Sequence, residues 1–388
     1  MSGPSNFSFT TITQLICQRG AARHLGQHVR ALQAALRVCL LVTDAGLRRS
    51  GLIEPACASL RAHGFTVHVF ADVLADPPAA TVLLATEFAR SHGVELVIGL
   101  GGGSSMDVAK LVAILAGNDQ ALDQIYGIGK VQGQRLPLVQ VPTTAGTGSE
   151  ATNIAIVTTG ETSKMGVVAS QLYADLAILD AELTLGLPPH ASAATGIDAM
   201  VHAIEAYTSR HKKNPISDML ARQALALLSA NLLKACENGD DLEAREAMLL
   251  GAYLAGTAFS NAPVAAVHAL AYPIGGLFHV AHGLSNSLVL PHVLRFNLPV
   301  AFEHYAELAS IVVPHASGSS EARAEALIVA MHQISAMTGI QTTLQQVGVK
   351  PSDLDRLAAD AMLQTRLLAN NPRELALADA RAIYAAAY

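Results

Sequence analysis

In the first half of the chain, short apolar runs alternate with segments of helical period, and this alternation restricts the fold more than any other feature. The apolar runs predict strands at 37–43, 66–70, 94–100, 137–141, 154–158, 165–169 and 176–179. The segments of helical period between them predict helices at 55–63, 79–92 and 104–116. Strand, helix and strand in succession are typical of βαβ units. We therefore expect an α/β domain with a mostly parallel sheet.

The pattern changes at Leu187-Pro188-Pro189. Beyond it, almost every long segment has helical period, namely 191–209, 215–236, 242–259, 299–312, 321–338 and 351–359. A length of 388 residues suits two domains of about 100–200 residues each. We predict an α/β domain over residues 1–188 and an all-helical domain over residues 189–388.

Composition excludes several classes of protein. Only 14% of residues are charged, against about 25% in an average soluble chain, so disorder is excluded. A net charge of -6 and 4% aromatic residues disfavour nucleic-acid binding. The most apolar stretch, 251–278, is interrupted by Pro263 and Pro273, and is interpreted as buried helix and loop rather than a membrane span. No signal peptide is recognisable, and four scattered cysteines indicate reduced thiols in a cytoplasmic protein.

A glycine-rich loop follows one of the expected strands. The run 94–100 leads into Gly101, Gly102, Gly103 and Ser104, and a helix carrying Asp107 follows. Glycines let the backbone approach a phosphate, and the free N–H groups of a helix N-terminus attract negative charge. The other interpretation is a tight turn closed by a capping box between Ser104 and Asp107.

A second loop, 142–150, also offers many donors. Its hydroxyl groups suit a diphosphate or a ribose and belong to Thr143, Thr144, Thr147 and Ser149. Asp44, at the end of the expected strand 37–43, suits the hydroxyls of an adenosine ribose and would repel the 2′-phosphate of NADP. Together these residues predict an NAD site. Asp44 is alternatively a turn residue before Ala45 and Gly46.

A third group of residues suggests a metal ion. Asp198 and His202 are four residues apart in a helix-favouring segment, so they share one helix face. His268, His279 and His282 follow about seventy residues later, among small apolar residues. A buried imidazole needs a partner, and a metal ion can be that partner. Each histidine taken alone is equally explained as a satisfied core residue.

Four segments together resemble the iron-containing (group III) alcohol dehydrogenase family, within the dehydroquinate synthase-like superfamily. They are GGGSSMDVAK at 101–110, PTTAGTGSE at 142–150, TGIDAMVHAIEAYTS at 195–209 and the stretch 268–297. The resemblance implies an N-terminal dinucleotide-binding domain and a C-terminal helical domain that bears the metal. It implies NAD(P) bound across both glycine loops, and at least a homodimer. It also implies one divalent ion held by Asp198, His202, His268 and His282.

From that ligand set we predict the chemistry. One carboxylate and three neutral imidazoles leave a divalent site with a net charge of about +1, which acidifies a bound alcohol or polarises an aldehyde or ketone. Hydride then passes between the alkoxide and the nicotinamide. His and Asp ligands suit Fe²⁺ or Zn²⁺. The prediction is an NAD-dependent, metal-dependent alcohol dehydrogenase or carbonyl reductase.

One departure from the family pattern leaves alternatives open. Many members have a histidine four residues after the third ligand, where it relays a proton, and here that residue is Tyr272. His279 is the other candidate relay, or else a wall residue facing solvent. Tyr272 followed by Pro273 is similar to the branch acting on hydroxy acids such as 4-hydroxybutyrate. The alternatives are therefore a hydroxy-acid dehydrogenase, a maleylacetate-reductase-like enzyme, a dehydroquinate-synthase-like lyase and a non-enzymatic protein.

Overall fold

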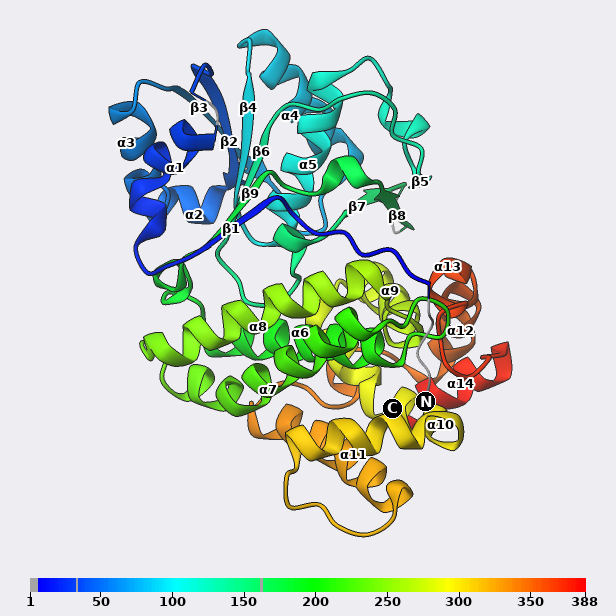
Figure 1. Cartoon of the computed structure of the whole chain (residues 1–388). Coiled ribbons are helices and arrows are strands. Elements are labelled where there is room, and N and C mark those ends of the chain that lie inside the picture. The colour runs from blue at the N-terminus through cyan, green and yellow to red at the C-terminus, as the bar shows by residue number, and fades with distance from the viewer. Residues whose placement is uncertain (1–5, 33, 161–162) are drawn as a thin grey trace. The chain divides into compact units, whose positions relative to one another are not determined.

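The computed structural model describes residues 6–32, 34–160 and 163–388, which fall into two compact units (Figure 1). The α/β unit comprises Thr11–Thr144 and Gly148–Gly186. The helical unit comprises Leu187–Tyr388 together with residues 6–10 and the tripeptide Ala145–Thr147. The second glycine loop thus has its centre in the helical unit and its two ends in the α/β unit.

A six-stranded parallel sheet forms the centre of the α/β unit, in the order β1-β9-β6-β4-β2-β3. Its strands are β1 (Gln14–Cys17), β2 (Val38–Asp44), β3 (Thr66–Val73), β4 (Leu96–Gly101), β6 (Leu138–Pro142) and β9 (Leu176–Leu179). The predicted parallel sheet is confirmed. Two predicted strands lie instead in a separate three-stranded sheet, formed by β5 (Gly127–Ile128), β8 (Ser163–Val168) and β7 (Ile154–Thr159).

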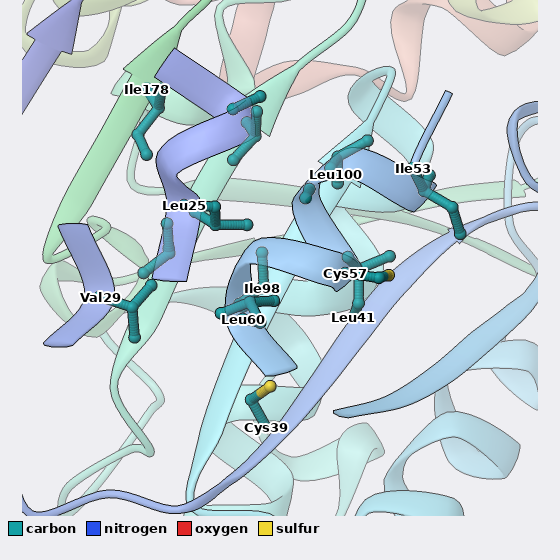
Figure 2. Packing of buried hydrophobic residues seen from close by; sticks show 14 of the residues in the cluster. Leu25, Val29, Cys39, Leu41, Ile53, Cys57, Leu60, Ile98, Leu100 and Ile178 are labelled. Atoms are coloured by element: carbon teal, nitrogen blue, oxygen red, sulfur yellow. The ribbon is translucent and has the colours of Figure 1, made fainter. Parts of the chain in front are cut away.

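Helices cover both faces of the six-stranded sheet. They are α1 (Leu25–Leu32), α2 (Ala45–Arg49), α3 (Glu54–Ala62), α4 (Ala79–Ser91) and α5 (Gly103–Gly117). Alternate residues of β2 and β4, such as Leu41 and Ile98, pack against Leu25 and Leu60 of α1 and α3 (Figure 2). Each such side chain contributes roughly 1.5–3 kcal/mol on burial. Helices α4 and α5 pack on the other face, where α5 lies along β4.

The short connections include several single turns of 3₁₀ helix. They are η1 (Ala21–His24), η2 (Leu122–Gln124), η3 (Ser149–Ala151), η4 (Ser170–Leu172), η5 (Ala181–Thr184), η6 (Leu344–Val347) and η7 (Pro351–Asp353). The turn that matters for function is η3, because it closes the second glycine loop.

The helical unit has no strand among its described residues, so the all-helical prediction is confirmed. Its helices are α6 (Pro189–Thr208), α7 (Pro215–Glu237), α8 (Leu242–Asn261), α9 (Ala266–Phe278), α10 (His282–Val312), α11 (Ser320–Met337), α12 (Leu354–Met362), α13 (Thr365–Leu368) and α14 (Leu377–Ala386). Helix α6 packs against α7, α8 and α10 and is buried almost all round from Ser192 onward. None of the described helices is long and apolar enough to cross a membrane.

Helix α10 is much longer than the sequence suggested. The helical period of the sequence predicted a helix only over residues 299–312. In the structure α10 begins at His282 and continues through Pro291 and Pro299. Packing against α6, α9 and α11 holds the helix together across these prolines. Because α10 starts this early, His282 lies at a helix N-terminus.

Candidate metal centre

Helix α6 presents three ionisable side chains on one face. Asp198, His202 and Glu205 are separated by four and three residues, the spacing that keeps side chains on the same side of a helix. All three are at most 4% exposed. Because α6 is surrounded by other helices, this polar face requires partners inside the protein.

Helices α9 and α10 bring the remaining histidines to α6. His268 lies in the first turn of α9, and His282 is the first residue of α10. The start of α10 packs tightly on α6, since a Cβ atom on Gly283 would lie 2.2 Å from the carbonyl oxygen of Ala194. Only glycine fits there, and this close approach puts His282 next to Asp198.

The four predicted ligands converge on one point. The Nε2 atoms of His202, His268 and His282 lie 3.8, 3.9 and 3.7 Å from Oδ1 of Asp198. One ligand atom from each of the four residues lies within 4.8 Å of all the others. Ligands bound at about 2.1 Å from one ion are separated by up to about 4.2 Å. The three distances to Asp198 lie within that limit, so the donor types and these distances fit a divalent metal ion.

The protonation states of Asp198 and His202 suit metal binding. Burial disfavours ionisation of Asp198, but the three histidines and Asn286 outweigh it, and its pKa is lowered. Burial lowers the pKa of His202 to about 3, although Asp198 opposes the shift. At pH 7 the site therefore offers a carboxylate and a neutral His202 imidazole, as metal binding requires.

Three of the four ligand side chains are buried, and one is partly exposed to solvent. The side chains of Asp198, His202 and His268 are 2–4% exposed, whereas that of His282 is 37% exposed. His282 is therefore the ligand through which the centre meets solvent. Catalytic metal sites keep such an open position, and purely structural ones do not.

Two further side chains support the ligands. Glu205 accepts a hydrogen bond from Nδ1 of His268 at 2.6 Å and another from the backbone N–H of Val267 at 2.7 Å. Asn286, one turn into α10, donates from Nδ2 to Oδ1 of Asp198 at 2.6 Å. Its Nδ2 also lies 3.3 Å from Nε2 of both His268 and His282.

Sequence reasoning missed both supporting residues. Glu205 follows His202 by three residues on the α6 face, and Asn286 follows His282 by four. Helical spacing was a usable signal for each. It was not decisive, because the partner of Glu205 lies 63 residues away in the sequence.

Rings hold His202 in place. Its imidazole is stacked between Phe259 at 4.4 Å and His268 at 4.8 Å, measured between ring centroids. Its Nδ1 is buried, and no carboxylate among the described residues bonds to it. The two buried imidazoles are thus fixed in different ways, His202 by stacking and His268 by a carboxylate.

The two candidate proton relays differ in position. Tyr272 lies one turn after His268 on α9, with its ring 5.9 Å from that of His282. His279 ends α9 in a left-handed conformation with a φ of 54°. A non-glycine residue rarely adopts that conformation. The side chain of His279 is exposed, and Tyr272 is the candidate beside the metal ligands.

The first glycine loop has the predicted strand-to-helix form. Strand β4 ends at Gly101, and α5 begins at Gly103 with Gly102 as its cap. No side chain caps this helix, so the alternative of a capping box between Ser104 and Asp107 is wrong. The reason is that Asp107 bonds elsewhere. Its Oδ1 accepts from Oγ of Ser149 at 2.6 Å, and its Oδ2 accepts from the N–H of Ile156 at 2.9 Å.

The start of the second loop lies beside the first loop. The N–H of Thr143 donates to the carbonyl of Gly101 at 3.0 Å, and a Cβ atom on Gly102 would be 3.6 Å from Thr144. Thr147 belongs to the central tripeptide that groups with the helical unit. The structure therefore brings Gly101–Gly103, Ser104, Thr143 and Thr144 to one edge of the parallel sheet.

Asp44 lies where the sequence placed it, at the end of β2, and it caps α2. Its Oδ1 accepts from the N–H groups of Gly46 at 2.8 Å and Leu47 at 3.0 Å. The turn interpretation thus describes its local bonds. Both bonds end on Oδ1, so the role proposed for the carboxylate toward a ribose stays a prediction.

Known proteins match both halves of the chain. A family model described as iron-containing alcohol dehydrogenase matches residues 13–181. A second, for the C-terminal part of the Fe-containing alcohol dehydrogenase family, matches residues 192–388. Together these matches span almost the whole chain.

Individual relatives are similar over nearly their full lengths. Long-chain-alcohol dehydrogenase 1 of Geobacillus thermodenitrificans is 44% identical over 95% of this chain and 93% of its own length. The NAD-dependent methanol dehydrogenase of Bacillus methanolicus is 36% identical over 93% of this chain and 94% of its own. A crystal structure of 1,3-propanediol oxidoreductase matches with a TM-score of 0.95 at 34% identity, covering 99% of this chain and 100% of that one.

Proposed function

The chain belongs to the iron-containing alcohol dehydrogenase family, and we propose that it is an NAD-dependent, metal-dependent dehydrogenase that interconverts an alcohol and its aldehyde or ketone. The observation that carries this proposal is the convergence of Asp198, His202, His268 and His282 on one point with one open side. A non-enzymatic protein has no need of buried ligands that open toward solvent at one place.

These four residues would hold Fe²⁺ or Zn²⁺. When bound, such an ion supplies a Lewis acid that lowers the pKa of an alcohol or polarises a carbonyl. The residues determine where this happens. Asp198 contributes the negative charge, His202 is neutral at pH 7, and the exposed side of His282 admits the substrate.

The α/β unit would bind the dinucleotide. We propose that the diphosphate is held by the glycine-loop residues Gly101, Gly102, Gly103 and Ser104, with Thr143 and Thr144 of the second loop beside it. Ser149, whose hydroxyl donates to Asp107, would hold the second loop against α5. Backbone N–H groups at the start of α5 support this assignment. Asp44 at the end of β2 would accept hydrogen bonds from the adenosine ribose, which favours NAD over NADP.

Either Tyr272 or His279 would move the substrate proton. Tyr272 is favoured by its place beside His282, and His279 by its strained backbone and its exposure. The change Tyr272→Phe removes only a hydroxyl group. If Tyr272 is the relay, kcat falls and its pH profile changes. If His279 is the relay, His279→Ala has that effect instead.

The substrate class is an alcohol and its carbonyl partner. The named relatives act on methanol, long-chain alcohols or propanediol, so they support the class and leave the chain length open. They do not favour the hydroxy-acid, maleylacetate-reductase-like or lyase alternatives. Because β1 is an exposed edge strand, we also propose a homodimer or a larger homo-oligomer.

The test is an anaerobic assay of NADH absorbance. Metal-free protein is reloaded separately with Fe²⁺ and Zn²⁺. Each form is given NAD⁺ and a panel of short primary alcohols, diols, long-chain alcohols and 4-hydroxybutyrate. We expect metal-dependent NADH formation with alcohols or diols. Bound metal and bound NAD without turnover of any alcohol would contradict the proposal.

A further inference from the structure

A second buried carboxylate lies behind the metal ligands. Glu205 is 4% exposed, and both of its carboxylate oxygens accept hydrogen bonds. Oε1 accepts from the N–H of Val267 at 2.7 Å, and Oε2 accepts from Nδ1 of His268 at 2.6 Å. One side chain of α6 therefore fixes both the backbone at the start of α9 and the ring that this helix carries.

This geometry determines which nitrogen of His268 carries the proton. A neutral imidazole has one N–H and one lone pair. Since Nδ1 donates to Glu205, the lone pair is on Nε2, the atom that lies 3.9 Å from Oδ1 of Asp198 and faces the other ligands. Without the carboxylate, the proton could equally occupy Nε2, and binding an ion there would first require moving that proton to Nδ1.

Glu205 also changes the charge of the site. Counting only the four ligands leaves a divalent centre with a net charge of about +1. With Glu205 in contact with a ligand ring, the buried centre becomes nearly neutral. A buried charge is strongly disfavoured unless it is compensated, so this second carboxylate stabilises the bound ion.

We propose that Glu205 is a positioning residue of the metal centre, which sets the tautomer and orientation of His268 and thereby strengthens binding of the divalent ion. The inference rests on the proposed function for the presence of that ion. It assigns to Glu205 no contact with substrate. His202 has no carboxylate behind it and is held between Phe259 and His268, so the effect acts through His268.

The chain offers a matched control. Glu307 of α10 is also a partly buried glutamate of the helical unit, and it accepts a hydrogen bond from the Tyr207 hydroxyl. Among the described residues, Glu307 forms no hydrogen bond or ion pair with any of the four ligands. Glu205→Gln and Glu307→Gln therefore make the same chemical change, next to a metal ligand in the first case and away from the ligands in the second.

The experiment measures the dissociation constant of Zn²⁺ and Co²⁺ by chelator competition on the full chain. Loss of such a supporting carboxylate typically weakens metal binding about 10–100-fold. We expect that loss in Glu205→Gln and less than a twofold change in Glu307→Gln. We also expect the visible absorption of the Co²⁺-loaded protein to shift only in Glu205→Gln, which a purely structural role would not cause.

A second variant keeps the test decisive if Glu205→Gln folds poorly. Glu205→Asp retains a carboxylate on a shorter stem, so its metal affinity should lie between those of the native chain and Glu205→Gln. An affinity within twofold of native in Glu205→Gln overturns the proposal. So does a Glu205→Asp protein whose metal affinity is within twofold of native, and this outcome does not depend on the folding of Glu205→Gln.

The outcomes separate this inference from the proposed function. Weakened metal binding in Glu205→Gln without alcohol turnover by the native chain would support the inference and contradict the proposed function. Alcohol turnover with unchanged metal affinity in Glu205→Gln would do the reverse. A native chain that binds no divalent ion would contradict both.

Discussion

The metal centre and the glycine loops are both built from motif residues, but their polar side chains behave differently. In the metal centre, Asp198 and three histidines point at a common position and are spaced for an ion. In the glycine loops, Asp107 and Ser149 bond to each other. The first group is arranged around one position that suits an ion, whereas the second pair bonds within the protein. A motif thus mixes residues that bind a ligand with residues that hold the binding loop in place.

Lys110 is the clearest residue of the second kind. It ends the first glycine motif, is fully buried, and donates to Oγ1 of Thr152 at 3.0 Å and to the carbonyl of Ile154 at 2.7 Å. Burial lowers its pKa to about 8, and Asp107 and Glu150 oppose that shift. Helix α5 thereby anchors the end of the second loop.

The largest effect is expected from His268→Ala. Removing one ligand should abolish stable metal binding and lower alcohol turnover about 10³-fold, because the Lewis acid contributes several kcal/mol to the rate. Metal content and NADH formation measure this. His190→Ala, an exposed histidine in the first turn of α6, is the control and should leave both unchanged. Turnover retained in His268→Ala would show that His268 is not a metal ligand.

Lys110→Met should affect the loops and leave the metal centre alone. The change leaves the Thr152 hydroxyl and the Ile154 carbonyl without their donor, which costs about 1–3 kcal/mol of unfolding free energy. We expect the dissociation constant of NAD to rise about tenfold and that of the metal to stay the same. Calorimetry of both ligands measures this. Unchanged NAD binding would show that the anchor is irrelevant to the cofactor.

Glu150 should make the unfolding free energy depend on pH. Burial raises its pKa from 4.5 to about 7, although Lys110 opposes the shift. Between these two values the folded protein keeps a proton that the unfolded chain has released. The stabilisation is therefore complete below pH 4.5 and is lost as pH rises to 7. Glu150→Gln should remove this pH dependence, which is worth about 3 kcal/mol of unfolding free energy over the whole interval.

Denaturant unfolding of the native chain and of Glu150→Gln between pH 5 and pH 8 measures that difference. The control is Glu87→Gln, at an exposed site on α4. If the unfolding free energies of the native and Glu150→Gln proteins change with pH in parallel, Glu150 is ionised in the folded state throughout this range.

The smallest effect separates two roles of Asp44. Asn caps a helix about as well as Asp, so Asp44→Asn should keep α2 and the unfolding free energy nearly unchanged. It removes the charge that would repel a 2′-phosphate, so the preference for NAD over NADP should fall about tenfold. Ratios of kcat/KM for the two cofactors measure it. A ratio that does not move would leave Asp44 with its capping role alone.

Much of the fold was predictable because local pattern determined it. Strand β9 lies at 176–179 as predicted, and β2, β4 and β6 begin or end within two residues of expectation. Buried parallel strands are short apolar runs, and such runs are visible in a sequence. The start of α10 was not predictable, since tertiary packing there overrides two prolines.

The candidate site was also predictable only where local sequence pattern determined it. Asp198 and His202 share a helix face, so their pairing follows from spacing alone. The resemblance to a family, rather than spacing, added His268 and His282 to the set. Glu205 was missed because its function depends on His268, and no local pattern joins residues from α6 and α9. The partners of Asp107 and Lys110 were missed for the same reason.

The burial of α6 determines when its amide hydrogens can exchange with solvent. A helix enclosed by α7, α8 and α10 can exchange its amide hydrogens only when the whole bundle comes apart. Peripheral helices such as α12 and α14 can fray without disturbing it. The amides around Asp198 and His202 should thus be among the slowest in the helical unit to exchange with deuterated water. We therefore expect the backbone that carries these two ligands to be among the last parts of the helical unit to unfold.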